Sequence, residues 1–207
     1  MIDIIIQHLF QRGIITYAKD KYRKASVSPF AGKAHPDDDP GKRLLQNLVN
    51  LARDPQLGGR IAFVEDYGEQ LAQYLVHGVN IWLNNPLPPF EACGTSGMKA
   101  ALNGVSHLSI LDGWWGEGFN GKNGWAIEHE KTSANPDSSD ADKIYRILEE
   151  EIIPLFYQMS ESGIPQEWVR LMKESIKSNA AEFSARRVVK EYIEKFYSKS
   201  IQKILKD

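Results

Sequence analysis

The middle of the chain alternates short apolar runs with segments whose apolar residues recur at helical spacing. Four apolar runs predict short buried strands, over residues 29–32, 60–64, 79–83 and 107–111. Three segments with helical spacing lie between them, over residues 42–52, 70–77 and 98–103. Strands and helices in alternation are typical of an α/β fold with a doubly wound parallel sheet.

The two ends of the chain have other patterns. The apolar residues of 1–28 show only a weak pattern, and we interpret this stretch as an atypical or truncated amino-terminal segment. We expect one domain over residues 29–207. From about residue 140 the chain is helical, and residues 140–156 keep their apolar positions on one side. Ser184 is a suitable cap for a last helix with an apolar face made by Val188, Val189, Tyr192, Ile193 and Phe196. The Ser- and Asp-rich residues 131–142 suit a mobile surface loop.

In parallel α/β sheets, ligands bind in the crevice outside the carboxyl ends of the strands. The loops that follow the expected strands are therefore the candidates for a site. They span residues 32–41, 65–68 and 84–97.

Composition excludes several classes of function. The 207 residues carry a net charge of −2 without a long basic run, which argues against a nucleic-acid partner. A mean hydropathy of −0.40 and the lack of a long apolar run argue against a membrane span. The single cysteine favours the cytoplasm, and the scattered histidines give no metal-ligand spacing. We therefore expect a cytoplasmic protein without a metal site.

Residues 88–99, PPFEACGTSGMK, carry the strongest chemical signal. A small-residue turn opens directly into a helix, where free amides and the Thr95 and Ser96 hydroxyls can hold an anion. Lys99 on the first turn can reach the same place. A phosphate beside a lysine suggests a nucleotide loop or a pyridoxal phosphate site. The nucleotide motif fails because Met98 separates Gly97 from Lys99, whereas a plain helix cap remains an alternative.

Several ordered motifs resemble the glycogen and α-glucan phosphorylases. EACGTSGMKAALNG at residues 91–104 is similar to the cofactor-lysine segment of that family. LDGWWGEG at 111–118 resembles its bacterial and archaeal branch, and AGKAHP at 31–36 and IPQEW at 164–168 agree as well. The resemblance covers roughly residues 30–197, and it corresponds to the carboxyl-terminal part of a much longer family chain.

The resemblance implies a fold and a reaction. The fold would be the carboxyl-terminal, Rossmann-like half of a two-domain glycosyltransferase, with carboxyl-terminal helices. The family splits a terminal α-1,4-glucosidic bond of a glucan with inorganic phosphate and releases glucose 1-phosphate with retained configuration. Its cofactor is pyridoxal 5'-phosphate, whose phosphate group takes part in proton transfer.

The resemblance also implies roles for single residues. Lys99 would bind the cofactor as a Schiff base, and the cofactor or substrate phosphate would lie against Gly94, Thr95 and Ser96. Glu91 matches an acid that hydrogen-bonds sugar hydroxyls, and Cys93 takes a place in the substrate site that is often held by serine. The remaining implied positions are the catalytic lysines beside the phosphates, Lys33 and Lys42, and a tyrosine near the cofactor, Tyr67. Ala34 and Gly68 stand where the family has arginines, which puts the binding of substrate phosphate most in question.

Three nearby side chains are open to a second interpretation. Trp114 and Trp115 are either a pair that stacks on a sugar or core residues, and Asp112 is either a ligand or a turn residue.

By the resemblance, the sequence contains almost none of the family's amino-terminal domain, of which Tyr22, Arg23 and Lys24 are a candidate remnant. We therefore expect the chain to be the cofactor-binding part of a phosphorylase, without activity alone. A non-catalytic relic or partner-binding subunit is the alternative, and a nucleotide-sugar glycosyltransferase is disfavoured because such an enzyme needs no Schiff-base lysine. The family's last helix packs on the amino-terminal domain, so its apolar face here predicts self-association or docking on a missing domain or subunit.

Overall fold

The computed structural model describes residues 28–57, 59–130 and 135–204, and these residues form two compact units. The first unit contains the described residues up to Leu75 together with 127–168. The second contains residues 76–126 and those from 169 onward. No helix in the described ranges is both long and apolar enough to cross a membrane.

A pair of parallel strands forms the sheet of the first unit. β1 (Ser28–Ala31) pairs with β2 (Ile61–Val64), with Phe30 opposite Phe63. Helix α3 (Asp39–Ala52) lies between them in the sequence and begins where the Asp38 side chain accepts from the Gly41 amide. A single 3₁₀ turn (Pro55–Leu57) follows this helix. The core of this part is a cluster of three buried aliphatic residues, Leu48, Leu57 and Ile61.

A long helical stretch completes the first unit. It consists of α7 (Pro136–Ile147), a π-helical turn (Leu148–Ile152) and α8 (Ile153–Tyr157). The mobile loop expected over 131–142 is wrong for residues 136–142, because the Asn135 side chain accepts from the Ser138 amide and Pro136 suits the first turn. Residues 131–134 lie outside the described ranges.

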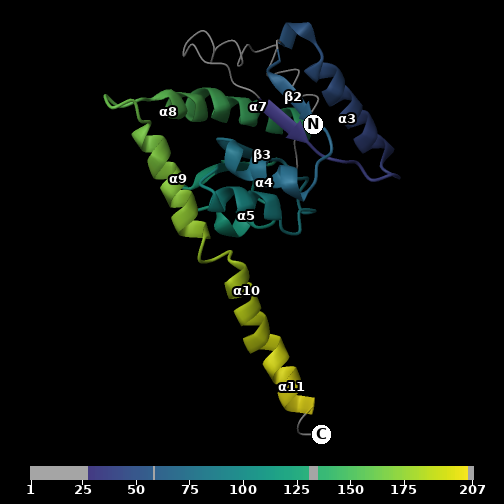
Figure 1. Cartoon of the computed structure of the whole chain (residues 1–207), viewed down its shortest axis with the longest axis vertical. Helices are drawn as coiled ribbons and strands as arrows, with labels where there is room; N and C mark the ends of the chain where they lie inside the picture. The colour runs from purple at the N-terminus through teal and green to yellow at the C-terminus, as the bar shows by residue number, and fades with distance from the viewer. Residues whose placement is uncertain (1–27, 58, 131–134, 205–207) are drawn as a thin grey trace. The chain divides into compact units, whose positions relative to one another are not determined.

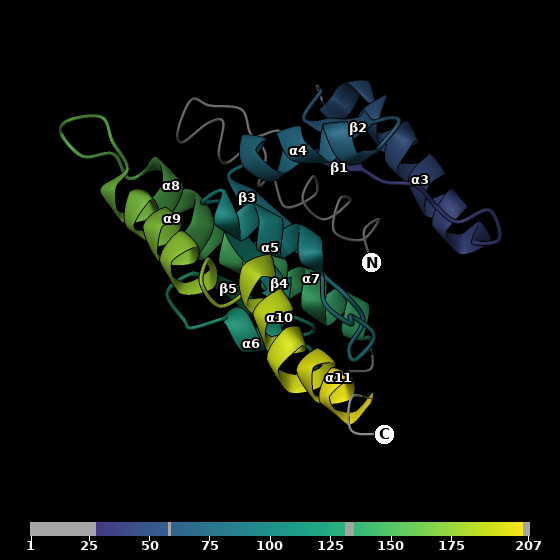
Figure 2. The ribbon, with the colours of Figure 1, turned by 60° about the horizontal axis from the view of Figure 1, so that its bottom comes forward.

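The second unit is built on a three-stranded sheet of order β3–β4–β5 (Figure 2). β3 (Ile81–Asn84) runs parallel to β4 (Ser106–Ile110), and β5 (Gly124–Ile127) is on the other side of β4. Every residue of β4 is buried, as a central strand requires. Two helices lie in the loops between these strands: α5 (Thr95–Leu102) and the short α6 (Trp115–Gly118). α4 (Glu69–Gly78) precedes β3 in the sequence.

The carboxyl-terminal part of the chain is helical. α9 (Gln166–Asn179) is followed by α10 (Ala185–Tyr192), a second π-helical turn (Ile193–Tyr197) and α11 (Ser198–Ile204) (Figure 1). Ser184 caps α10 as expected, since its hydroxyl oxygen accepts from the Arg187 amide at 3.2 Å. The predicted α/β class with parallel strands is confirmed.

Candidate functional site

Two loops at the carboxyl ends of β3 and β4 are joined in the second unit. The Glu91 amide donates to Asp112 Oδ2 at 3.0 Å, and the Trp114 amide donates to the Cys93 carbonyl at 2.8 Å. Gly113 has a positive φ of 53°, and a Cβ on it would lie 2.6 Å from the Cys93 carbonyl oxygen, so only glycine fits there. Asp112 therefore holds the site loop in place, which favours its structural interpretation.

The loop after β3 opens into α5 through Gly94, which is left-handed with φ 83° and ψ 50°. Among the residues that the structure describes, no side chain caps this helix. The first amides of a helix have no partner within it. The Glu91 carboxylate packs over the turn, since its Oε1 would lie 3.0 Å from a Cβ on Gly94. The turn thus offers amides and the Thr95 and Ser96 hydroxyls to an anion, with a carboxylate next to it.

Lys99 lies one turn further along α5, and its side chain is exposed. In the described part of the chain no side chain or carbonyl binds its ammonium group, whereas its own carbonyl accepts from Asn103 Nδ2 at 2.8 Å. The uncapped turn at Gly94 has free amides that suit the phosphate of pyridoxal phosphate. The Lys99 amine, one turn later and exposed, suits its aldehyde. Gly94, Thr95 and Ser96 would hold the phosphate, and Lys99 would bind the aldehyde carbon. Cys93 is half-buried on the same turn, with its Sγ 3.6 Å from Met98 Sδ.

The first turn of α5 rests on two buried rings, a feature that sequence reasoning missed. His107 of β4 and Trp114 have their ring centroids 5.2 Å apart, and Trp115 packs edge-on against His107 at 4.7 Å. Gly97 fits directly against them, because a Cβ on it would lie 2.5 Å from His107 Cε1 and 2.9 Å from Trp114 Nε1. Trp114 and Trp115 are 3% and 0% exposed, so they are core residues and do not stack on a sugar.

His107 is uncharged in this place. Burial lowers its pKa to about 3, and the backbone of Trp82 opposes that shift only in part. Neither ring nitrogen, nor Trp114 Nε1, has a hydrogen-bond partner of good geometry within residues 28–57, 59–130 and 135–204. A neutral ring is therefore the only form that this core accommodates.

We expect acid to destabilise the protein through His107. Between about pH 6.5 and 3, the histidine of the unfolded state, whose pKa is near 6.5, binds a proton, whereas His107 in the folded state does not. The contribution of the neutral ring is complete above pH 6.5 and is lost as the pH falls, by about 1.4 kcal/mol per pH unit. We expect the free energy of unfolding, measured with urea, to fall between pH 7.5 and pH 5 by about 2 kcal/mol more in the wild type than in His107→Gln. Equal losses in the two proteins would contradict this.

The other residues implied by the resemblance lie in the first unit. Lys33 follows β1 and pairs with Asp66, which follows β2, at 3.3 Å on the exposed surface. Lys42 on α3 pairs with Asp39 at 2.9 Å and donates to the Pro36 carbonyl. Tyr67 is half-buried in the loop after β2. Lys33 and Tyr67 thus occupy loops at the carboxyl edge of their own sheet, where a ligand is expected.

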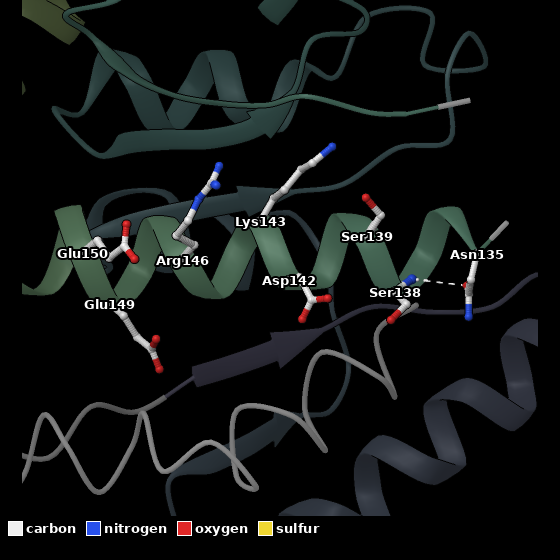
Figure 3. Close-up of a pocket in the computed structure, with 8 residues that line it drawn as sticks. All are labelled: Asn135, Ser138, Ser139, Asp142, Lys143, Arg146, Glu149 and Glu150. Atoms are coloured by element: carbon white, nitrogen blue, oxygen red, sulfur yellow. Dashed lines mark hydrogen bonds between the residues drawn. The ribbon is translucent and has the colours of Figure 1, made fainter. Parts of the chain in front are cut away.

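A separate cavity of about 620 Å³ lies along α7 in the first unit (Figure 3). Its lining mixes basic Lys143 and Arg146 with acidic Asp142, Glu149 and Glu150. Lys143 is already engaged, since it donates to Glu130 Oε1 at 2.8 Å and to the Glu128 carbonyl at 2.6 Å. This mixture favours no single class of ligand. In the described ranges, no three His, Cys, Asp or Glu side chains cluster as metal ligands would.

Comparison with known proteins gives strong matches to longer proteins. Glycogen phosphorylase of Aquifex aeolicus is 60% identical over 173 residues, which is 84% of this chain and 25% of the relative. Maltodextrin phosphorylase of Thermococcus litoralis and glycogen phosphorylase of Mycobacterium tuberculosis are 47% and 44% identical over 83% of this chain and 20% of theirs. The chain thus spans about a fifth to a quarter of the length of these relatives. No family model matches it.

Proposed function

Because the chain belongs to the α-glucan phosphorylase family, we propose that it is the cofactor-binding part of an α-1,4-glucan phosphorylase. The reaction would transfer a terminal glucosyl residue of an α-1,4-glucan to inorganic phosphate and yield glucose 1-phosphate with retained configuration. The observation that carries this proposal is the uncapped turn at Gly94 with the uncommitted Lys99 one turn later.

The residues of the second unit have distinct roles in this proposal. Lys99 attaches pyridoxal phosphate, and the amides and hydroxyls of Thr95 and Ser96 hold its phosphate beside Gly94. When bound, the cofactor supplies a phosphate group that exchanges protons with the substrate phosphate. Glu91 accepts hydrogen bonds from sugar hydroxyls, because its carboxylate lies against the turn at Gly94.

The residues of the first unit complete the proposal. Lys33 and Lys42 neutralise phosphate charge, for which each must leave its present surface ion pair. Exposed pairs of this kind contribute little to stability, so exchanging them for a phosphate costs little. Tyr67 packs near the cofactor. The glucan and phosphate are the expected partners, and the cytoplasm is the proposed compartment.

The test is the absorption spectrum of the purified chain with and without pyridoxal phosphate. We expect a new band on addition of the cofactor, and after borohydride reduction one label per chain on the peptide that contains Lys99. Glucose 1-phosphate formation from maltodextrin and phosphate is measured on the same sample, and little or none is expected from the chain alone. A label on another peptide, or no label, would contradict the proposal.

A further inference from the structure

The loop after β2 contains a backbone conformation that only glycine adopts easily. Asp66 has a φ of 55°, and apart from glycines it is the one residue with a positive φ in the ranges that the structure describes. Aspartate tolerates the left-handed region better than most residues, but the conformation still costs free energy, and such residues cluster at functional sites. The side chain of Asp66 is therefore a candidate for a function.

Asp66 pairs with Lys33, a residue that the proposed function places beside phosphate. Lys33 Nζ donates to Asp66 Oδ1 at 3.3 Å. In the parallel sheet Ala31 and Val64, the last residues of β1 and β2, lie opposite each other. Lys33 and Asp66 each follow two residues later, so the pair joins two loops at the carboxyl edge of this sheet, where ligands of α/β proteins bind.

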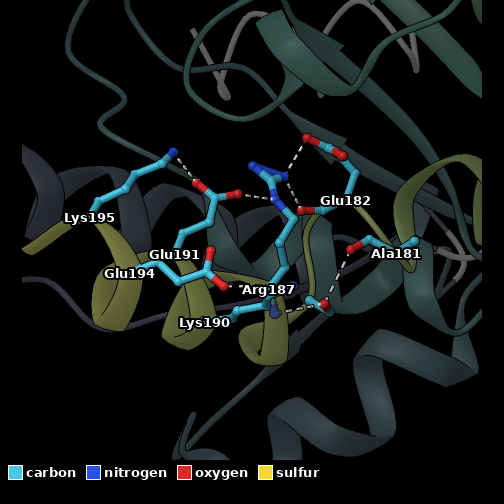
Figure 4. A network of polar contacts seen from close by, with 8 residues as sticks. Ala181, Glu182, Arg187, Lys190, Glu191, Glu194 and Lys195 are labelled. Carbon is cyan, nitrogen blue, oxygen red and sulfur yellow. Dashed lines mark hydrogen bonds and ion pairs between the residues drawn. The ribbon is translucent and has the colours of Figure 1, made fainter. Parts of the chain in front are cut away.

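Stability does not explain this ion pair. Its two side chains are 61% and 98% exposed, and exposed pairs add little to stability. The pairs of the carboxyl-terminal helix are of another kind, since Arg187 and Lys195 each bind Glu191 one turn away and support the helix on which they lie (Figure 4). Lys33 and Asp66 are 33 residues apart and belong to no helix. Their pairing fits a ligand site better than it fits structural support.

Side by side, the two groups offer a donor and an acceptor. A lysine ammonium group only donates hydrogen bonds, and a carboxylate only accepts them. Oδ2 of Asp66 has no hydrogen-bond partner among the described residues, so it is available to a ligand. An oxyanion that carries a hydroxyl group can donate to Asp66 while it accepts from Lys33. An oxyanion without a hydroxyl group can bind only Lys33, and the carboxylate repels it.

We propose that Asp66 makes the site at Lys33 selective for oxyanions that carry a proton, and in particular for inorganic phosphate over sulfate. Both forms of inorganic phosphate that exist near neutral pH keep at least one P–OH group, whereas sulfate has none. Lys33 donates to one phosphate oxygen, and Asp66 accepts from the P–OH group. The two anions are similar in size and shape, so the acceptor decides between them. The inference rests on the proposed function, which places inorganic phosphate at Lys33.

The test compares the dissociation constants of inorganic phosphate and sulfate for the full 207-residue chain, measured by NMR titration at neutral pH and constant ionic strength. We expect the wild type to bind phosphate about tenfold more tightly, because sulfate leaves the acceptor unpaired, an effect that solvent weakens at an exposed site. In Asp66→Asn the repulsion is lost and the side-chain amide can donate to either anion, so the two constants should differ by less than about twofold.

Asp54→Asn is the matched control for the change of charge. Asp54 precedes β2 and so lies at the opposite edge of the same sheet, where its Oδ1 accepts from the Gln56 amide at 2.8 Å. This variant should keep the preference for phosphate. Asparagine also tolerates the left-handed region, so both variants should unfold in urea at the wild-type midpoint. A wild type without the preference, or an Asp66→Asn protein that keeps it, would overturn the inference.

Lys33→Met separates this inference from the proposed function. If Lys33→Met binds phosphate as tightly as the wild type, the proposed role of Lys33 is wrong and the inference fails with it. If Lys33→Met loses phosphate binding while Asp66→Asn keeps the preference, the inference alone is wrong. In the double variant Lys33→Met, Asp66→Asn, the second substitution should no longer change the ratio of the two constants, because Asp66 acts beside Lys33.

Discussion

Gly97→Ala is expected to destabilise the protein by about 2–3 kcal/mol and to reduce cofactor labelling at Lys99 strongly. The added methyl group would lie 2.5 Å from His107 Cε1 and 2.9 Å from both His107 Nε2 and Trp114 Nε1. Neither ring has room to move, because both are buried and Trp115 packs against each of them. The first turn of α5 must then lift away from β4, and it carries the amides of Thr95 and Ser96 with it.

Gly78→Ala is the matched control for this variant. Gly78 ends α4, its φ is not positive, and a Cβ on it would meet nothing within 4 Å. Alanine is intrinsically better than glycine in a helix by up to about 1 kcal/mol, so the control should be as stable as the wild type or slightly more stable. Urea unfolding and label stoichiometry are measured on both variants. A Gly97→Ala protein that matches its control in both would show that the rings do not support the turn.

The expected strands agree with the observed ones to within two residues at either end. The run Ile61–Val64 is short, apolar and bounded by the polar residues Arg60 and Glu65, so its limits are visible in the sequence. β5 was not predicted, because Gly124–Ile127 contains a glycine and an alanine and gives no alternating pattern. Its place beside β4 is determined by contacts between distant residues, among them the Trp115 indole that donates to the Trp125 carbonyl at 3.0 Å.

The start of α7 shows how composition can mislead. Residues 136–142 read as a loop because serine, aspartate and proline are poor helix formers in a helix interior. The same residues are favourable in the first turn, where Asn135 accepts from the Ser138 amide and Pro136 has no amide to leave unpaired. Ala141 then enters the core with 0% exposure.

The loop of the candidate site could be predicted from the sequence, whereas the buried rings on which this loop rests could not. The turn at Gly94 could be found because glycine, small hydroxyl residues and a lysine are consecutive in the sequence. His107 could not, because a single histidine in a buried strand has no distinguishing pattern, and it meets Gly97 only through the packing of α5 on β4. Only the folded structure shows that neither of its ring nitrogens has a hydrogen-bond partner of good geometry among the described residues.

Lys99→Arg is expected to abolish the borohydride-fixed cofactor label completely while stability stays within about 0.5 kcal/mol of the wild type. Attachment of the aldehyde needs a neutral amine, and arginine is not deprotonated in proteins, so the variant keeps the positive charge without the chemistry. Because the Lys99 side chain is exposed, its replacement creates no cavity and leaves no buried group unpaired.

Lys122→Arg is the matched control, since Lys122 is an exposed lysine of the same unit and should keep the full label. The comparison separates attachment from anion binding. If Lys99→Arg still retains pyridoxal phosphate reversibly, as measured by equilibrium dialysis, the turn at Gly94 holds the phosphate without the covalent bond. If the variant keeps a covalent label, another lysine is the attachment point. The anion turn would then be a helix start with no part in binding the cofactor.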